Sequence, residues 1–134
     1  MKVVLDTNVL VSAVLTPHGV SARVLDAVLA GVIELAIDDR ILDEYRQVLA
    51  RPKFGLPANA IHDLLAFLHG AAEHVVALRV KERLPDEDDR PFLEVARTAG
   101  ATLVTGNARH FPAHVRRSLR VLSPAELLAR LPEA

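Results

Sequence analysis

The 134-residue chain contains no cysteine. This absence excludes disulfide bonds and thiolate chemistry, so any metal ion must be bound by oxygen or imidazole ligands. No uninterrupted apolar stretch is long enough to cross a bilayer, and the chain opens on Met1 and Lys2 followed by a strand pattern rather than a signal peptide. We therefore expect a cytoplasmic protein without a membrane partner.

The chain also lacks an excess of either charge and has few aromatic side chains. Its 16 basic and 17 acidic residues leave a net charge of −1, and its aromatic residues are four Phe and one Tyr. Proteins that bind nucleic acid through their whole surface are usually strongly basic, and a base-stacking platform needs more aromatic rings. Any contact with nucleic acid must therefore be local, assisted by a metal, or shared with another subunit.

Short apolar runs alternate with segments of helical periodicity along the sequence. Strands are predicted over residues 3–5, 32–37, 75–80, 101–104 and 120–122, and helices over 9–15, 21–30, 39–51, 58–71, 92–100 and 124–131. The polar residues 81–90 are predicted to form a loop. This alternation predicts one α/β domain over residues 1–134, with a mostly parallel sheet between helices on both faces.

Asp6 interrupts the apolar opening of the chain, VVLDTNVLV, where the first predicted strand ends. A carboxylate at the end of a buried strand needs a compensating cation or hydrogen-bond donor, and ligands of open parallel sheets bind at this edge. The alternative interpretation is that Asp6 only caps the helix that follows.

Four further polar residues stand at positions from which they can join Asp6. Asn8 and Asn107 follow predicted strands, Asp89 precedes a predicted helix, and Glu44 lies next to the core-facing side of another. Crowded carboxylates raise one another's pKa values, and a divalent cation with oxygen ligands, such as Mg²⁺ or Mn²⁺, relieves this repulsion. Such an ion suits the attack of water on a phosphodiester.

Four stretches of the sequence carry a resemblance to a known family. In chain order they are VVLDTNVLVSA, ILDEYRQVLARPKF, DEDDRPFLEVA and LVTGNARHFP, which together extend from Val3 to Pro112. They resemble the PIN-domain family of metal-dependent ribonucleases, and specifically the VapC-like toxin components of bacterial and archaeal toxin–antitoxin pairs. One such stretch is a weak signal, whereas four in order are a strong one.

The resemblance implies a three-layer α/β/α fold with a Rossmann-like parallel sheet. It also implies that Asp6, Glu44 and Asp89 are catalytic residues that hold Mg²⁺ or Mn²⁺, with Asn8 in a supporting polar role. The implied substrate is RNA, cut by a water molecule, and the implied partners are an antitoxin protein and a second copy of the chain in a homodimer.

The chain departs from the family pattern at Asn107, where many relatives carry a fourth acid. An amide oxygen can orient a water molecule or ligate weakly, but it contributes no charge, so we expect looser metal binding, and an inactive member is an open alternative. Thr105 is either a supporting hydrogen-bonding residue or a plain turn residue. Arg109 and His110 are candidate RNA contacts, and the alternative for both is an ordinary surface position.

Neighbouring acids leave the register of the site open. Asp89 is favoured over Asp88 because Phe92 and Ala96 follow it at offsets of three and seven and continue the buried helix face. Asp43 is the alternative to Glu44. A zinc site is not expected, since Pro112 separates His110 from His114 and no third partner is evident.

Three functional hypotheses follow from these residues. The leading one is a Mg²⁺- or Mn²⁺-dependent endoribonuclease that acts as a toxin. The second is a weak or inactive PIN module that binds RNA or a protein partner, and Asn107 favours it. The third is a phosphatase of the haloacid-dehalogenase type, which would need a second Asp two residues after the first, where this chain has Asn8.

Overall fold

A five-stranded parallel sheet forms the centre of the computed structural model, which describes residues 1–132. The strands are β1 (Lys2–Leu5), β2 (Glu34–Ile37), β3 (Glu73–His74), β4 (Thr102–Val104) and β5 (Val121–Leu122), in the spatial order β3-β2-β1-β4-β5. Every neighbouring pair is parallel. The central strand β1 is therefore covered on both faces, which explains its unbroken apolar run Val3–Leu5.

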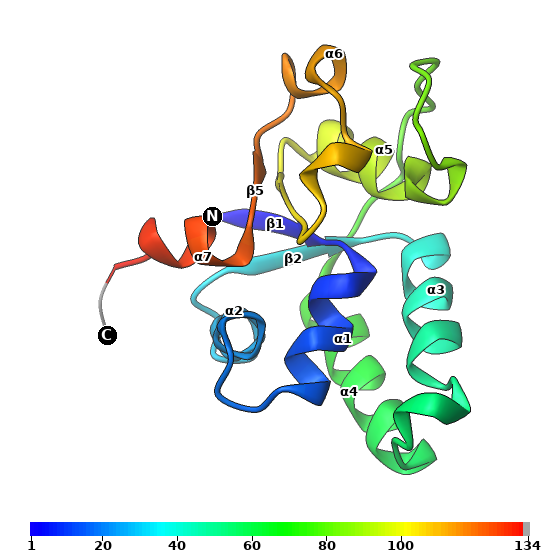
Figure 1. Cartoon of the computed structure of the whole chain (residues 1–134), viewed down its shortest axis with the longest axis vertical. Coiled ribbons are helices and arrows are strands. Elements are labelled where there is room, and N and C mark those ends of the chain that lie inside the picture. The colour runs from blue at the N-terminus through cyan, green and yellow to red at the C-terminus, as the bar shows by residue number, and fades with distance from the viewer. Residues whose placement is uncertain (133–134) are drawn as a thin grey trace.

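Helices cover both faces of the sheet and complete a three-layer α/β/α fold, as predicted. In Figure 1, α1 to α4 lie on one side of the sheet and α5 and α6 on the other. The helices are α1 (Thr7–Leu15), α2 (Val20–Leu29), α3 (Asp39–Leu49), α4 (Ala58–Ala71), α5 (Arg90–Ala99), α6 (Ala113–Arg116) and α7 (Pro124–Ala129). The sequence did not predict the short α6. Short 3₁₀ turns span Pro52–Phe54, Glu87–Asp89 and Ala108–His110.

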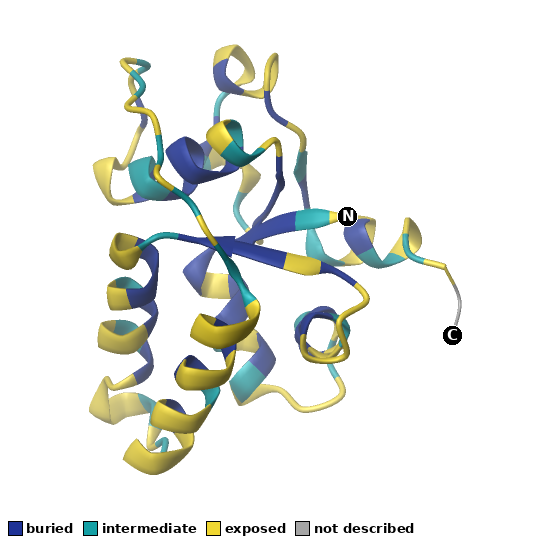
Figure 2. Cartoon of the chain, turned by 180° about the vertical axis from the view of Figure 1, so that it is seen from behind, coloured by how far each residue is buried: buried dark blue, intermediate teal, exposed yellow. Residues whose placement is uncertain are grey.

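The buried faces of these elements form the core. Figure 2 shows most of β1 and β2 and the inward faces of the helices as buried, whereas the outer faces of α3 and α4 are exposed. Tyr45 of α3 is fully buried, and its hydroxyl donates a hydrogen bond to the carbonyl oxygen of Leu5, at 2.6 Å. Its ring packs against Phe92 of α5, with the ring centroids 6.4 Å apart. This contact fixes α3 beside the C-terminal end of β1, where the site is built.

The predicted strand over residues 75–80 is wrong. Only Glu73–His74 pair with β2, and the last backbone bond to that strand runs from Val75 N to Ile37 O, at 2.9 Å. Val76 and Leu78 are 92% and 73% exposed. The β-branched, apolar composition of the segment favoured a strand, but its backbone groups find other partners.

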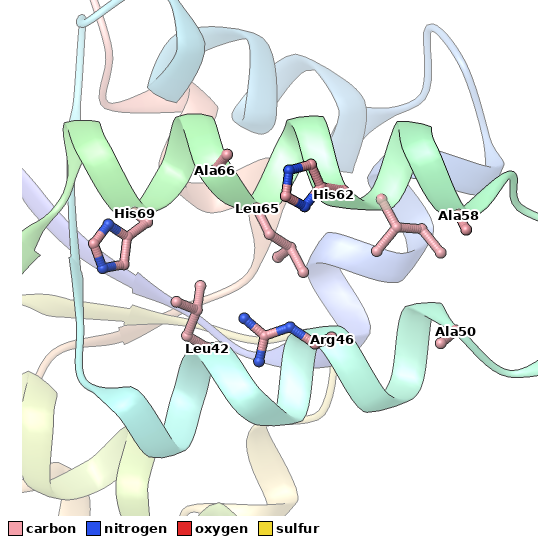
Figure 3. Close-up of a pocket in the computed structure, with 9 residues that line it drawn as sticks. Leu42, Arg46, Ala50, Ala58, His62, Leu65, Ala66 and His69 are labelled. Carbon is pink, nitrogen blue, oxygen red and sulfur yellow. The ribbon is translucent and has the colours of Figure 1, made fainter.

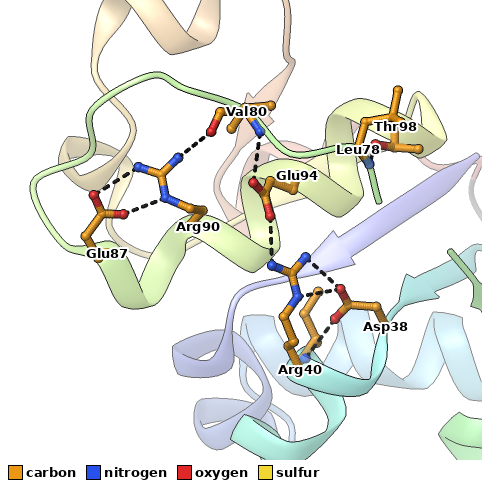
Figure 4. Close-up of polar contacts among 9 residues, drawn as sticks. Asp38, Arg40, Leu78, Val80, Glu87, Arg90, Glu94 and Thr98 are labelled. Carbon is orange, nitrogen blue, oxygen red and sulfur yellow. Dashed lines mark hydrogen bonds and ion pairs between the residues drawn. The ribbon is translucent and has the colours of Figure 1, made fainter. Parts of the chain in front are cut away.

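Those partners are side chains of α5. Thr98 accepts a hydrogen bond from Leu78 N and Glu94 accepts one from Val80 N, each at 2.9 Å. Glu94 is buried and also binds Arg40, at 2.7 Å (Figure 4). Burial acts to raise the pKa of Glu94, but the hydrogen bonds from Arg40 and Val80 outweigh it and hold the pKa below its ordinary value. The segment is thus tied to α5 instead of to the sheet.

The loop predicted over residues 81–90 is present over residues 81–86, whereas Glu87–Asp89 form a 3₁₀ turn and α5 begins at Arg90. Arg90 holds this loop. The Arg90 guanidinium donates to the carbonyl oxygen of Val80 at 2.9 Å and pairs with Glu87 at 2.6 Å (Figure 4). It also donates to the carbonyl oxygen of Glu82, at 2.8 Å. These bonds fix the start of α5 and, with it, the adjacent Asp89.

The predicted capping box of the last helix is confirmed. The Ser123 hydroxyl accepts from Glu126 N and the Glu126 carboxylate accepts from Ser123 N. The helix ends at Ala129, two residues before the predicted boundary. None of the helices within residues 1–132 is both long and apolar enough to span a membrane.

Candidate active site

Asp6 both caps a helix and reaches into the site, so the two interpretations of its sequence position are compatible. It lies at the C-terminal end of β1 and is only 6% exposed. Its Oδ1 accepts a hydrogen bond from Thr7 N, at 2.8 Å, and its Oδ2 accepts one from the hydroxyl of Thr105, at 2.7 Å. Thr105 follows β4, the strand that pairs with β1, so the neighbouring strand ends meet at this edge as expected.

Glu44 approaches Asp6 from α3. It is half-buried, and its carboxylate accepts a hydrogen bond from the hydroxyl of Thr7, the first residue of α1. Burial raises the pKa of Glu44 above its ordinary value against the lowering effect of the Thr7 hydrogen bond, and the nearby charge of Asp6 adds to the rise. The pKa of Asp6 is also raised, chiefly by burial.

Asp89 reaches the same place from the start of α5. It ends a 3₁₀ turn that is capped by Asp86, whose carboxylate accepts from Asp88 N at 2.9 Å. Asp89 is 7% exposed. Burial first, and then the charge of Asp6, raise the pKa of Asp89 to about 6.

His110 is the neighbour of Asp89 that the sequence did not reveal. Its Nδ1 lies 2.9 Å from Asp89 Oδ2, and its Nε2 lies 2.8 Å from the amide nitrogen of Asn107. This distance allows an ion pair, but within residues 1–132 the buried Asp89 Oδ2 accepts no hydrogen bond. Such an atom needs a cation or a water molecule.

These side chains line one cavity of about 400 Å³. Asp6, Glu44 and Asp89 line it together with Asn8, and the open rim adds Asp86 and Asp88. Asp43 lies outside the cavity, where it is exposed and pairs with Arg46 at 2.8 Å. The structure therefore places Glu44 rather than Asp43 in the cavity, while both Asp88 and Asp89 line it and only Asp89 is buried.

The remaining predicted residues lie around this cavity. His110 lines it, whereas Thr105, Asn107 and the exposed Arg109 do not. Asn8 accepts a hydrogen bond from Gly106 N at 3.3 Å, and the Thr105 hydroxyl accepts one from Asn107 N at 3.0 Å. Thr105 and Asn107 thus do not line the cavity but contact side chains that do, Asp6 and His110.

Sequence reasoning missed several lining residues. The first helix contributes Thr7, Val11 and Ser12 beside Asn8. The end of α3 contributes Val48, and the segment after it contributes Arg51 and Phe54. The spacing of four residues, which puts Thr7 with Val11 and Asn8 with Ser12 on one helix face, was a signal for the first group. Asp86 was visible only as part of an acidic run.

The donors fit a hard divalent cation. The close acidic groups offer only oxygen ligands, their pKa values are raised, and Asp89 Oδ2 lacks a donor. Within residues 1–132, no three His, Asp or Glu side chains are close enough to bind one ion together. Mg²⁺ is usually bound by one or two carboxylates and several waters, so the arrangement suits an ion held partly through water.

A larger groove of about 490 Å³ lies between α3 and α4. Leu42, Leu65 and small alanine residues line it, with Arg46, His62 and His69 as its ionisable groups (Figure 3). It holds no carboxylate, so the hydrolytic chemistry suggested by the acids belongs to the smaller cavity.

Comparison with known proteins gives a family and a fold. A family model for the PIN domain matches residues 2–109. The chain is 29% identical over 110 residues to the uncharacterized protein MJ1680 of Methanocaldococcus jannaschii, covering 80% of this chain and 71% of that protein.

Solved structures of similar fold include three from bacteria. For VapBC2 from Rickettsia felis, bound to a DNA fragment from their promoter, the TM-score is 0.59 at 18% identity, covering 92% of this chain and 98% of that one. For VapBC-1 from nontypeable Haemophilus influenzae the TM-score is 0.61 at 16% identity, covering 93% of this chain and 99% of that one. For FitAcB from Neisseria gonorrhoeae the TM-score is 0.59 at 18% identity, covering 92% of this chain and 98% of that one.

Proposed function

The chain belongs to the PIN domain family, and we propose that it is a Mg²⁺- or Mn²⁺-dependent endoribonuclease that acts as the toxin of a toxin–antitoxin pair. The observation that carries the proposal is the meeting of Asp6, Glu44 and Asp89, from three separate elements, in one cavity at the C-terminal ends of β1 and β4. Membership of a family of nucleases supports the reaction class, and RNA as the substrate rests on the sequence resemblance.

Asp6, Glu44 and Asp89 would hold the divalent ion partly through water molecules, because these side chains are not close enough to ligate one ion together. When bound, the ion lowers the pKa of a water molecule and offsets the negative charge that develops on the phosphate. The protein supplies the orientation of the carboxylates: Thr105 and Thr7 donate to Asp6 and Glu44, and His110 stands beside Asp89. Outer groups of this kind typically change metal affinity or activity by about 10- to 100-fold.

The proposed partner is an antitoxin protein. Its support is the sequence resemblance to toxin components, together with the similarity in fold to the VapBC and FitAcB structures. A homodimer is proposed on the sequence resemblance alone.

Asn107 favours a second candidate, a PIN module that binds RNA or a protein partner without cutting it. Its amide nitrogen lies against His110 and its side chain does not line the cavity, so this position adds no acid to the site. Membership of the PIN domain family leaves the phosphatase hypothesis without support.

Substitutions at two adjacent residues of α3 test the proposed nuclease against the non-cutting module. Glu44→Gln is expected to reduce Mn²⁺-dependent cleavage of a single-stranded RNA by at least about 10-fold, because the cavity loses one of its three central charges. Asp43→Asn is the matched control, since Asp43 lies one residue away and outside the cavity. The measurement is the initial rate of cleavage across a Mn²⁺ titration, with a chelator as the blank.

Equal rates for Glu44→Gln and the unmodified chain would contradict the proposed site. Binding of RNA by the unmodified chain without cleavage at any Mn²⁺ concentration would favour the non-cutting module.

A further inference from the structure

The charged groups that line the cavity are unevenly distributed. Arg51 is the only lysine or arginine among the residues that line it within the described part of the chain. Its ionisable neighbours are His110 and five acids: Asp6, Glu44, Asp86, Asp88 and Asp89. A polyanion that enters this cavity therefore meets repulsion from most of its wall and a full positive charge at one position.

The Arg51 side chain has no partner in residues 1–132: it forms no ion pair and no side-chain hydrogen bond there. The cavity's other nitrogen base, His110, is engaged by Asp89 and Asn107. Five carboxylates line the same cavity, yet none of them binds the guanidinium. Arg51 is thus left free to bind an anion from outside the chain.

The backbone around Arg51 is well fixed. Its N–H donates to the carbonyl oxygen of Val48, at 3.1 Å, and its own carbonyl oxygen accepts from Phe54 N, at 3.0 Å. Pro52 begins the 3₁₀ turn and Gly55 ends it with a φ of 61°, a conformation that glycine adopts readily. Phe54 of this turn also lines the cavity. The turn therefore presents Arg51 at a defined place beside the acids.

We propose that Arg51 binds a phosphate of the RNA strand and thereby positions the neighbouring phosphodiester over Asp6, Glu44 and Asp89. This inference rests on the proposed function, of which it names the phosphate-binding residue. A guanidinium is suited to the role because its planar donors match two phosphate oxygens at once. Contacts to phosphate fix the register of a nucleic acid without reading its sequence. One local cation also explains how a chain of net charge −1 can bind RNA.

A different role for Arg51 would be purely structural. It follows the C-terminal end of α3, where a positive charge favourably meets the helix dipole. That role affects the stability of the fold and leaves RNA affinity unchanged. Arg46 is the matched control, because it is an arginine of the last turn of α3, points into the groove between α3 and α4, and lines no part of the acidic cavity (Figure 3).

The test measures RNA binding separately from cleavage. In the full-length chain carrying Asp6→Asn, the affinity for a fluorescent 12-nucleotide oligouridylate is measured by anisotropy at several salt concentrations in Mg²⁺. Adding Arg51→Gln is expected to weaken binding by about 10-fold and to lower the slope of log affinity against log salt by about 0.7. Arg51→Lys is expected to restore the slope and part of the affinity, and Arg46→Gln to match the parent.

Unchanged affinity and slope in Arg51→Gln would overturn the proposal, and so would a parent chain that binds no oligouridylate at low salt. Melting temperatures of all variants are recorded, and a loss of RNA affinity that follows a loss of stability would assign Arg51 a structural role. Failure of the proposed function would look different: an RNA-binding chain with the Arg51 effect intact, but with no cleavage by the unmodified protein.

Discussion

Replacing Asp6 with Asn is expected to reduce RNA cleavage by at least about 100-fold and to leave the fold intact. The loss follows because the Asp6 carboxylate shares the cavity with Glu44 and Asp89 and its charge raises the pKa values of both. The fold should survive because Asn is as good a helix cap as Asp and its amide can still bond to Thr7 and Thr105. Cleavage is measured in Mn²⁺, and folding by circular dichroism and thermal unfolding.

Asp38→Asn provides the control for this prediction. Asp38 follows β2 as Asp6 follows β1, and its carboxylate caps α3 by accepting from Ile41 N at 3.0 Å, but it does not line the cavity. Its replacement should leave cleavage unchanged. Undiminished cleavage in a contaminant-free preparation of Asp6→Asn would refute the assignment of this cavity as the active site.

Replacing Asp89 with Asn is expected to remove cleavage while making the metal-free protein more stable. The folded protein holds the pKa of Asp89 at about 6, above its ordinary value of 3.8, so at neutral pH the buried ionised carboxylate costs free energy. This pKa shift corresponds to about 2 to 3 kcal/mol in the free energy of unfolding, or roughly 10 °C in Tm. Thermal unfolding of both proteins in a chelator measures this difference.

The pH dependence of that difference has a definite sign. Because folding raises the pKa of Asp89, its contribution to stability is most favourable below about pH 4 and declines as pH rises towards 6. The advantage of Asp89→Asn in Tm should therefore be small at pH 4 and full at pH 7.5. Asp88→Asn, an exposed neighbour, should show little change. An advantage that is equal at both pH values would contradict this account.

The sequence predicted the fold well because its determinants are local. The apolar run Val3–Leu5, the cap at Asp38 and the capping box at Ser123 each lie within a few residues of the element they define. The segment 75–80 failed for the opposite reason: its composition favours a strand, but Thr98 and Glu94, far along the chain, take its backbone bonds.

The candidate site was predictable where topology alone decides position. Asp6 and Thr105 meet because parallel strands end at one edge, and the buried face of α5 selects Asp89 over Asp88. The contact of Thr7 with Glu44 and that of His110 with Asp89 join separate elements, and no spacing in the sequence predicts them. Arg51 was visible only as one of several scattered basic residues.

The proposed nuclease requires that the cavity lined by Asp6, Glu44 and Asp89 captures a divalent cation. Crystals of the protein soaked in Mn²⁺ test it most directly, through the anomalous scattering of the ion. We predict a peak between Asp6 and Asp89, with water completing the coordination, and its loss in Asp89→Asn. A peak confined to other parts of the surface, or an unfilled cavity at saturating Mn²⁺, would contradict the account.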